Sequence, residues 1–402
     1  MAQPSRRTFI ESAAAGLIVA PRVLAAEGAA AAKPAITVGL VGVGSRGSQF
    51  AGLLARHAGF KVTAVADYFA PTAERVGERL GVPKARCFSG LGACQRLLAS
   101  KVDAVLLETP PYFFPQHAKA AVEAGCHVYM AKPVAVDVPG CLAILAAGQA
   151  ARRAGKVFLV DFQTRTCPFH REGIQRVHDG FIGPVGLIHS WYHDDGFGDP
   201  PLGKTWEGRL RGLVWVNDNV LGGGYLVNAG IHAVDVALWA ANATPQSAVG
   251  VSARKRPRAN GDTHDTYALT YTFANGAAMA HTGEHIANAT GRRIGCLVYG
   301  QRGHLATDYG GTGLVQIRAT HDVWQGGADP GLFGHGMERN LQTFYESIAQ
   351  GNASNPTIEP AVNATLATIL GREAGLQGRC VTWEELLRDT RRLELDTTGL
   401  TV

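Results

Sequence analysis

The sequence contains few of the patterns that mark disulfide-rich or metal-binding proteins. Its seven cysteines are an odd number and include no C-x-x-C pair, so a disulfide framework is not expected. Cys126, Cys141 and Cys296 fall inside predicted strands or helices, where a free cysteine packs as a small hydrophobic residue. The 14 histidines include no H-E-x-x-H or similar helical pair. We therefore predict no metal site.

Strong charge and long apolar segments are also missing. The formal net charge is only +5, and the chain has no long basic face, which argues against nucleic acid as a partner. The densest basic run, residues 254–258, is predicted to be a solvated turn between two strands. The apolar run at residues 13–20 is too short for a permanent membrane span. The composition is ordinary for a soluble globular protein, and we expect its partner to be a small molecule.

Residues 1–26 look like a cleaved export signal. Residues 5–10 read S-R-R-T-F-I, a twin-arginine pattern, and the apolar residues that follow end at Pro21. The small residues around Ala25 suit a signal peptidase. Residues 27–34 are rich in alanine and are predicted to form a flexible tether. These features predict export to the periplasm by the twin-arginine route.

The stretch at residues 36–47, I-T-V-G-L-V-G-V-G-S-R-G, predicts a nucleotide-binding turn. An apolar strand leads into Gly42-x-Gly44-x-x-Gly47. Gly42 allows the tight turn, Gly44 lets a pyrophosphate approach the backbone, and Gly47 lets the next helix pack close to the strand. The N-terminal N–H groups of that helix point at the phosphates. The predicted cofactor contacts in this turn are Gly42, Val43, Gly44, Ser45, Arg46 and Gly47.

Asp67 indicates which nucleotide binds. It ends the second predicted strand, 20 residues after Gly47, where a carboxylate holds the ribose hydroxyls of NAD. The same charge repels the 2′-phosphate of NADP, and the next two residues offer no cation to bind one. We predict NAD as the cofactor, with NADP as the alternative because Arg46 and Arg75 are near in the sequence.

Helices and strands alternate from residue 35 to about residue 155. Strands are predicted at 104–108 and 127–130, each followed by a helix. This repetition predicts a Rossmann domain over 35–155, a doubly wound parallel sheet that binds ligands at the carboxyl ends of its strands. At such ends lie four further predicted cofactor contacts, Thr109, Pro110, Pro111 and Lys132.

The pattern changes after residue 155, and the chain is too long for one core. We predict a second α/β domain over 156–402, which begins with a strand at 157–163. Four longer segments have strand character: 247–253, 266–273, 276–285 and 292–298. Asn275-Gly276 between two of them is a strong hairpin signal. A largely antiparallel, open sheet is therefore predicted.

A helix predicted at about 224–241 carries three polar residues in an otherwise apolar run. Asn228, His232 and Asp235 are spaced i, i+4 and i+7, which places them on one face. Buried polar groups need partners, and a histidine has a pKa near working pH, which suits a general base. We expect His232 to act on a substrate, and Asp235 to orient it or to hold the helix.

Five segments of the chain resemble the glucose-fructose oxidoreductase/inositol dehydrogenase/MocA (Gfo/Idh/MocA) family. They read VGLVGVGSRG, VADYFAPTAERV, DAVLLETPPYFFPQHAKAAVEAGCHVYMAKPVAVD, GGGYLVNAGIHAVDVALW and GRCVTWEELL. The T-P-P turn, the K-P pair and the G-x-H-x-x-D helix are the most specific parts. The resemblance implies the two domains described above, with an open sheet that often packs against its counterpart in another subunit, and hence a homodimer or homotetramer. It also implies an NAD(P)-dependent enzyme that transfers hydride to or from a hydroxyl/carbonyl pair of a sugar, glycoside or cyclitol.

Two positions depart from the family pattern. The K-P pair usually follows Glu and here follows Ala131, and the first polar position of the helix is usually Asp and here is Asn228. An amide hydrogen-bonds a hydroxyl but takes no proton near neutral pH. We therefore predict His232 as the catalytic base, Lys132 as the group that stabilises charge on the same oxygen, and Asn228 as a positioning contact.

The predicted substrate contacts are Arg165, Trp191, Asn228 and His232. Arg165 follows the strand at 157–163, and its alternative role is that of an ordinary surface arginine. Trp191 borders a long polar loop, where an aromatic ring can stack on a sugar face, and its alternative role is ordinary packing.

Two further functions are compatible with the sequence. The first is a glycosidase that oxidises its sugar transiently and reduces the product with the same bound NAD, which needs no outside cofactor and so suits an exported enzyme. The second is an exported sugar-binding protein without redox activity. Asn228 in place of the usual acid is the feature that favours the second alternative.

Overall fold

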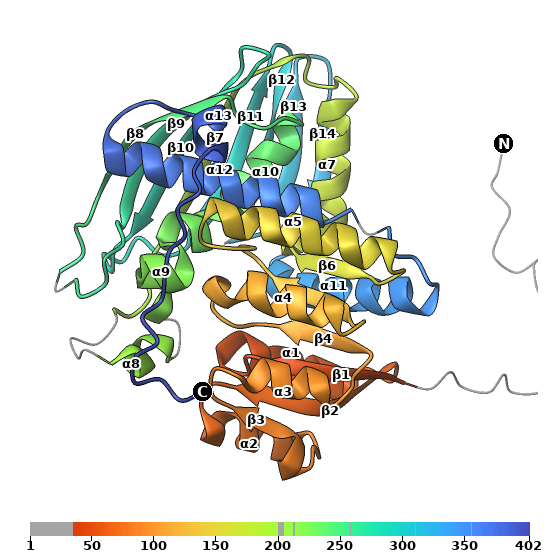
Figure 1. Ribbon diagram of the computed structural model, residues 1–402. Coiled ribbons are helices and arrows are strands. Elements are labelled where there is room, and N and C mark those ends of the chain that lie inside the picture. Colours follow the sequence, from red (N-terminus) through yellow and green to blue (C-terminus); the bar gives the residue numbers. More distant parts are fainter. Residues whose placement is uncertain (1–34, 200–204, 212–213, 258, 310, 355) are drawn as a thin grey trace, which may run out of the picture. The chain divides into compact units, whose positions relative to one another are not determined.

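The computed structural model describes residues 35–199, 205–211, 214–257, 259–309, 311–354 and 356–402. The predicted export signal and tether, residues 1–34, lie outside the described residues. Residues Ala35–Val402 form one unit. Two sheets follow one another along this unit, and Figure 1 shows both with the helices that cover them.

Among the described residues, the first sheet has six parallel strands in the order β3-β2-β1-β4-β5-β6. The strands are β1 (Ile36–Val41), β2 (Phe60–Asp67), β3 (Cys87–Ser89), β4 (Ala104–Leu107), β5 (His127–Ala131) and β6 (Phe158–Asp161). The end of β1 and all of β4 are buried, which is why both appear in the sequence as continuous apolar runs. The predicted doubly wound parallel sheet is confirmed.

Helices cover both faces of this sheet. On one face lie α1 (Ser45–Arg56), α2 (Ala70–Arg79) and α11 (Leu332–Ala349), and on the other α3 (Ala93–Ala99), α4 (Phe114–Glu123) and α5 (Val138–Arg153). Asp137 caps α5, because its Oδ1 accepts a hydrogen bond of 2.8 Å from the Gly140 amide. This cap ends the turn that follows β5, and that turn carries Lys132.

The strand predicted at 157–163 belongs to the first sheet and not to the second domain. It is β6, which pairs in parallel with β5 and brings Ala131 opposite Asp161. The prediction was wrong for this strand because an apolar run does not reveal which sheet it joins. Helix α11, more than 150 residues later, packs on the same sheet through Met337, Leu341 and Phe344.

The second sheet is mostly antiparallel, as predicted. In the described residues it has the order β14-β13-β12-β11-β7-β10-β9-β8-β15, with only β7 and β10 paired in parallel. The strands are β7 (Val185–Asp194), β8 (Ser247–Ala253), β9 (Thr266–Thr272), β10 (Ala278–His285), β11 (Arg293–Gly300), β12 (Gly303–Asp308), β13 (Val315–Ala319), β14 (Val323–Gly327) and β15 (Val381–Thr382). The predicted hairpin joins β9 to β10, with Gly276 at a φ of +82°.

Three longer helices cover one face of the second sheet. They are α7 (Pro168–His178), α10 (Ile231–Ala241) and α12 (Ile358–Gln377), and Figure 1 shows α10 and α12 lying along it. The remaining short helices are α6 (Gln163–Thr166), α8 (Trp206–Leu210), α9 (Asn219–Gly222) and α13 (Trp383–Leu387). No helix in the described ranges combines the length and apolar character needed to cross a bilayer.

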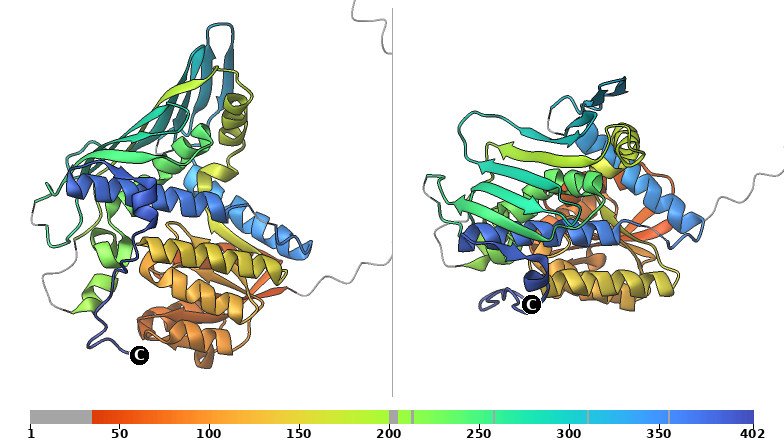
Figure 2. Two further views of the ribbon diagram at one scale, coloured as in Figure 1. Left: turned by 45° about the horizontal axis from the view of Figure 1, so that its top comes forward. Right: turned by 90° about the horizontal axis from the view of Figure 1, so that it is seen from above.

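The C-terminal segment, residues 388–402, returns from α13 to the side of the first sheet, as Figures 1 and 2 show. Its backbone is held there by the Leu393 amide, which donates to Asp137 Oδ2 at 2.9 Å. The Leu91 amide donates to the Thr401 carbonyl, also at 2.9 Å. The last residues of the chain therefore lie beside the loop that follows β3.

Candidate active site

A cavity of about 570 Å³ lies at the carboxyl ends of the parallel strands. This is the edge where open α/β sheets bind ligands, and the volume suits a cofactor or small molecule. The predicted cofactor contacts that line it are Gly42, Gly44, Ser45, Arg46, Asp67, Thr109 and Pro110. The predicted contacts Val43, Gly47, Pro111 and Lys132 do not line it.

The glycine turn has the geometry that a dinucleotide requires. Gly42 has a φ of +83°, and a Cβ there would lie 2.7 Å from the Glu108 backbone. A Cβ on Gly47 would lie 1.9 Å from the Gly42 carbonyl oxygen, so only glycine permits this helix packing. A Cβ on Gly44 would meet nothing within 4 Å, so the space in front of Gly44 is open for a pyrophosphate.

Asp67 ends β2 and also braces the turn. Its Oδ2 accepts a hydrogen bond of 2.9 Å from the Val43 amide, and its Oδ1 accepts one of 3.0 Å from the Phe69 amide. Burial raises the pKa of this carboxyl, and the two amides oppose that shift. Val43 therefore contributes through its backbone rather than by touching the cavity.

Segments far along the chain complete the wall of this cavity. Leu210, Arg211 and Trp215 line it, and the Arg211 guanidinium lies 4.1 Å from the centre of the Phe69 ring. The Tyr68 hydroxyl donates to Glu207 Oε1 and accepts from the Thr401 amide, both at 3.0 Å. These contacts were not predicted, because no sequence pattern links a loop near residue 210 or a C-terminus to β2.

Lys132 follows β5, is half-buried and reaches a helical segment of the second half of the chain. Its Nζ donates a hydrogen bond of 2.8 Å to the backbone carbonyl of Asn228. Burial lowers the pKa of Lys132 to about 7, and Arg46 acts in the same direction, while Asp161 and Glu108 oppose the shift. The amine is therefore poised between its charged and neutral forms near neutral pH.

The polar helix is irregular where Asn228 lies. Leu226–Gly230 is a π-helical segment, and the regular helix α10 begins only at Ile231. Such segments are frequent at functional sites. Asn228 and His232 are both buried, and Lys132 contacts the carbonyl of residue 228 and not its side chain. Any amino acid at position 228 offers this carbonyl.

His232 is buried between two tyrosines. Its ring stacks on Tyr309 with the ring centres 4.8 Å apart and on Tyr192 at 6.3 Å. Its Nδ1 has no hydrogen-bond partner among the described residues. Burial lowers the pKa of His232 well below its usual value, and the cations Lys132, Arg46 and Arg292 lower it further. The imidazole is therefore neutral at physiological pH.

Arg46 connects the nucleotide cavity to the cluster around Lys132 and His232. The residue lines the cavity, and its guanidinium forms an ion pair with Asp161 at the end of β6. Asp161 also accepts a hydrogen bond of 2.9 Å from Gln163 Nε2. Sequence reasoning identified Arg46 as a cofactor contact but missed Asp161 and Gln163, because β6 had been placed in the other domain.

Two predicted substrate contacts are engaged elsewhere. Arg165 makes a bidentate contact with buried Asp235, with N···O distances of 2.8–3.1 Å. This pairing supports the role of Asp235 in holding the helix, and it engages the guanidinium that was predicted to contact substrate. Trp191 lies on the open face of the second sheet beside His189, with the ring centres 5.5 Å apart. Its neighbour Tyr192 faces His232, because side chains alternate along a strand.

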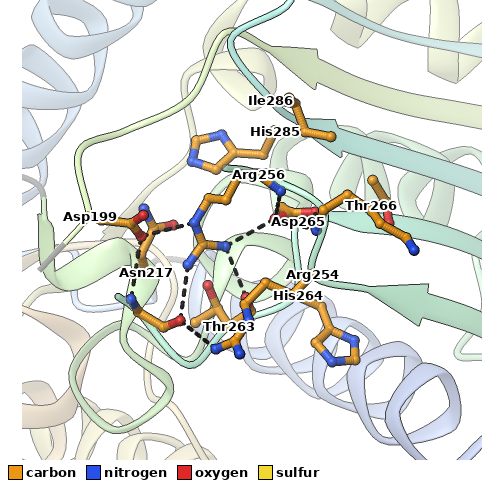
Figure 3. Close-up of polar contacts among 12 residues, drawn as sticks. Asp199, Asn217, Arg254, Arg256, Thr263, His264, Asp265, Thr266, His285 and Ile286 are labelled. Atoms are coloured by element: carbon orange, nitrogen blue, oxygen red, sulfur yellow. Dashed lines mark hydrogen bonds and ion pairs between the residues drawn. The ribbon is translucent and has the colours of Figure 1, made fainter. Parts of the chain in front are cut away.

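The basic run at 254–258 is only partly a solvated turn. Arg254 and Lys255 are exposed, whereas the Arg256 side chain is 7% exposed and pairs with Asp199 and Asp265 (Figure 3). Arg256 also donates to the Thr263 carbonyl at 2.9 Å. The prediction was wrong for Arg256, which ties the loop after β7 to the start of β9.

The chain belongs to the Gfo/Idh/MocA family. The family model described as "Oxidoreductase family, NAD-binding Rossmann fold" matches residues 36–162, and the "GFO/IDH/MocA C-terminal domain" matches residues 170–306. The chain is therefore a member of an oxidoreductase family, and its first sheet is an NAD-binding Rossmann fold. This confirms the family, the fold and the cofactor class expected from the sequence.

Characterised relatives resemble the chain to different extents. Inositol 2-dehydrogenase 3 of Saccharopolyspora erythraea is 25% identical over 82% of this chain and 90% of that protein. A glycosyl hydrolase family 109 protein of Streptomyces coelicolor is 29% identical, over 41% of this chain and 35% of that protein. Aldose-aldose oxidoreductase from Caulobacter crescentus shares the fold, with a TM-score of 0.69 and 21% identity over 87% of this chain and 99% of that one.

We expect the Arg165–Asp235 pair to contribute to stability rather than to substrate affinity. Asp235 is fully buried, so Arg165→Met leaves an unpaired carboxylate in the interior. Breaking such a pair costs about 3 kcal/mol or more in the free energy of unfolding, which urea denaturation measures. The matched control is Arg388→Met, which removes an exposed pair with Glu384 and should change stability by less than about 1 kcal/mol. Unchanged stability with a large rise in KM for substrate would restore Arg165 as a substrate contact.

Proposed function

We propose that the chain oxidises a hydroxyl of a sugar, glycoside or cyclitol, or reduces the corresponding carbonyl, with NAD as the hydride carrier. The observation that carries this proposal is that half-buried Lys132 and buried His232 interact with each other and with Arg46, which also lines the nucleotide cavity. The full-length relative named inositol 2-dehydrogenase 3 supports a polyol substrate.

The roles proposed for Lys132 and His232 are the reverse of those predicted from the sequence. Bound NAD supplies the hydride acceptor. Lys132 Nζ takes the hydroxyl proton, since an amine with a pKa of about 7 accepts a proton readily at neutral pH. The Asn228 carbonyl keeps that amine in place. His232, held neutral, hydrogen-bonds the same oxygen, because its lowered pKa makes it a poor proton acceptor.

A transient-oxidation glycosidase is the second candidate. It is favoured by the likeness to a glycosyl hydrolase family 109 protein, although that likeness covers only 35% of the relative. The nucleotide cavity bounded by three chain segments also suits a cofactor that stays bound through a cycle without net redox change. Release of the aglycone without accumulation of NADH from test glycosides would identify this activity.

We expect turnover to depend on the neutral form of Lys132. Sugar oxidation needs the unprotonated amine, so kcat should rise as pH increases through about 7. Lys132→Met should lower kcat by about 10²–10⁴-fold and remove this limb of the pH profile. Lys119→Met is the matched control, because Lys119 is exposed and paired with Glu123. A Lys132→Met protein with full turnover and an unchanged pH profile would contradict the proposed role.

We further propose that the chain is exported with its nucleotide already bound. Residues 1–26 carry the twin-arginine pattern, and that route moves folded proteins. Two contacts to Tyr68, from Glu207 and from the C-terminal Thr401, support retention of the nucleotide near Asp67. Asp67 itself supports NAD over NADP, because its carboxylate would repel a 2′-phosphate.

The protein, purified without added nucleotide and then denatured, should release near-stoichiometric NAD or NADH and little NADP. Tyr68→Phe removes the hydroxyl that joins the two contacts, each of which contributes about 1 kcal/mol. Nucleotide should then dissociate up to about 30-fold faster in a dilution experiment, if both contacts are lost. Tyr345→Phe, at a ring packed on Phe60 behind the sheet, should leave the rate unchanged. Protein that purifies free of nucleotide would count against both retention and export.

The open face of the second sheet supports assembly into a homodimer or homotetramer, as proposed from the resemblance. Exposed apolar residues gather on this one face, which is the face that carries Trp191: Leu187, Val249, Val251, Tyr299 and Val323. Single exposed apolar residues are ordinary, but several of them on one uncovered sheet face favour an interaction surface there.

Light scattering should give a solution mass that is a multiple of the monomer mass. The double substitution Leu187→Glu/Val251→Glu places charges on the open face, so the mass should fall toward that of one chain. Leu376→Glu introduces a charge at an apolar residue of α12 that is 44% exposed, away from this face, and should not change the mass. A wild-type protein that is monomeric at micromolar concentration would refute the assembly.

A further inference from the structure

Two acidic residues, Glu108 after β4 and Asp161 at the end of β6, lie on either side of Ala131 at the end of β5. The register pairs Leu107 with Met130 and Ala131 with Asp161. Glu108, which follows Leu107, therefore lies at the same edge as Ala131 and Asp161. Both acidic side chains are only 1% exposed. A buried carboxylate needs a cation or several hydrogen-bond donors.

Arg46 supplies that cation from the glycine turn. Its guanidinium forms the ion pair with Asp161, and its Nε lies 3.9 Å from Glu108 Oε2. The guanidinium also packs 5.3 Å from the centre of the Phe50 ring, which keeps the side chain extended across the sheet edge. The methyl group of Ala131 leaves room between the two acids, and a longer side chain there would compete for that space.

Asp161 is the centre of a longer chain of contacts. Besides Arg46, it accepts hydrogen bonds from Gln163 Nε2 at 2.9 Å and Asn340 Nδ2 at 2.6 Å. Gln163 Oε1 in turn accepts a hydrogen bond of 3.2 Å from the Tyr309 hydroxyl. The Tyr309 ring is the closer of the two tyrosine rings that stack on His232. An unbroken path of contacts thus leads from the phosphate-binding turn to the candidate active site.

We propose that Asp161 is a positioning residue of the proposed reaction, and that it joins Arg46 of the glycine turn to the tyrosine packed on His232. Asp161, Glu108 and Arg46 also interact electrostatically with Lys132 and together influence its protonation. This inference rests on the proposed function, since it assigns these residues a role in that chemistry. Asp161 does not line the cavity, so its contacts reach the site through Arg46, Gln163 and Tyr309, while its charge also acts on Lys132.

The electrostatic part of the proposal has a definite sign. The groups that interact electrostatically with Lys132 are Arg46 from α1, Glu108 after β4 and Asp161 at the end of β6, and Lys132 in turn acts on the neutral His232 of α10. Arg46 lowers the pKa of Lys132, and the two acids raise it. Removing an acid should therefore lower the pKa of Lys132, and removing Arg46 should raise it.

The test compares Asp161→Asn, Arg46→Met and the double variant. In Asp161→Asn the acidic limb of the kcat profile should move to lower pH by about one unit, and in Arg46→Met to higher pH by a similar amount. The double variant should return close to the wild-type position. Asp161→Asn should also lower kcat by at least about tenfold, because a displaced Tyr309 ring shifts the groups around the substrate. The matched control is Asp103→Asn at the other end of β4, where the carboxylate binds Thr37, and it should move neither quantity.

Two further measurements keep the test decisive. If Asp161→Asn fails to fold, Gln163→Met should lower kcat without moving the pH limb, because it breaks the contact path to Tyr309 but removes no charge. Competitive acetylation of Lys132, followed by peptide mass spectrometry, reads its protonation without any turnover. Acetylation could show that the pKa of Lys132 falls in Asp161→Asn and rises in Arg46→Met while the protein oxidises no sugar. That result would support the electrostatic part of the inference and refute the proposed function. Sugar oxidation with the same pH limb in all three variants would overturn the inference and leave the proposed function standing.

Discussion

The site depends on one hydrogen bond between the two halves of the fold. Lys132 leaves the end of β5 and donates to the Asn228 carbonyl in the π-helical segment above the second sheet. Backbone contacts around this bond fix the same junction, because Arg372 of α12 donates to the carbonyls of Val136 and Gly223, both at 3.0 Å. The Asn228 carbonyl therefore holds the amine, and Arg372 holds the surrounding segments together. This arrangement places a titratable group between a nucleotide cavity and a helix that carries His232.

Partial burial of the charged Lys132 has an energetic cost, which neighbouring charges offset. Burial alone favours the neutral amine, and the two carboxylates at adjacent strand ends favour the charged one. Burial raises the pKa of Glu108 itself to about 8, so near neutral pH this acid is mostly protonated and opposes the neutral amine less than a full charge would. Arg46 balances them by crossing the strand ends. The stability of such a cluster depends on each of its members. Removing one member leaves an unpaired buried charge, which costs more free energy than the intact pair contributes.

Much of this site could be predicted from the sequence, because residues close together in the chain form a recognisable motif when they must adopt a particular backbone geometry. Glycines that must adopt a positive φ or allow close packing, as at Gly42 and Gly47, are visible as a motif. Lys132 and Asp67 were found because parallel strands deliver their last residues to one edge. His232 was found because a polar residue stands out in an apolar helix.

Features fixed by tertiary structure could not be predicted in this way. Trp191 and Tyr192 are equally aromatic in the sequence, and only the sheet register decides which one faces His232. Asp161 had no predicted role, because the strand that carries it joins a sheet assembled from distant segments. The tie between Tyr68 and Thr401 spans 333 residues, a separation at which hydrophobic periodicity gives no information.

A structure of the protein with NAD and a sugar bound would test the central claim most directly, namely that Lys132 and His232 act on one substrate oxygen. The hydroxyl on the carbon nearest the nicotinamide should lie about 3 Å from Lys132 Nζ and within hydrogen-bond reach of His232. That sugar should also lie on the Tyr192 side of the second sheet. A reactive hydroxyl bound elsewhere, with Lys132 still tied only to the Asn228 carbonyl, would contradict the proposed mechanism.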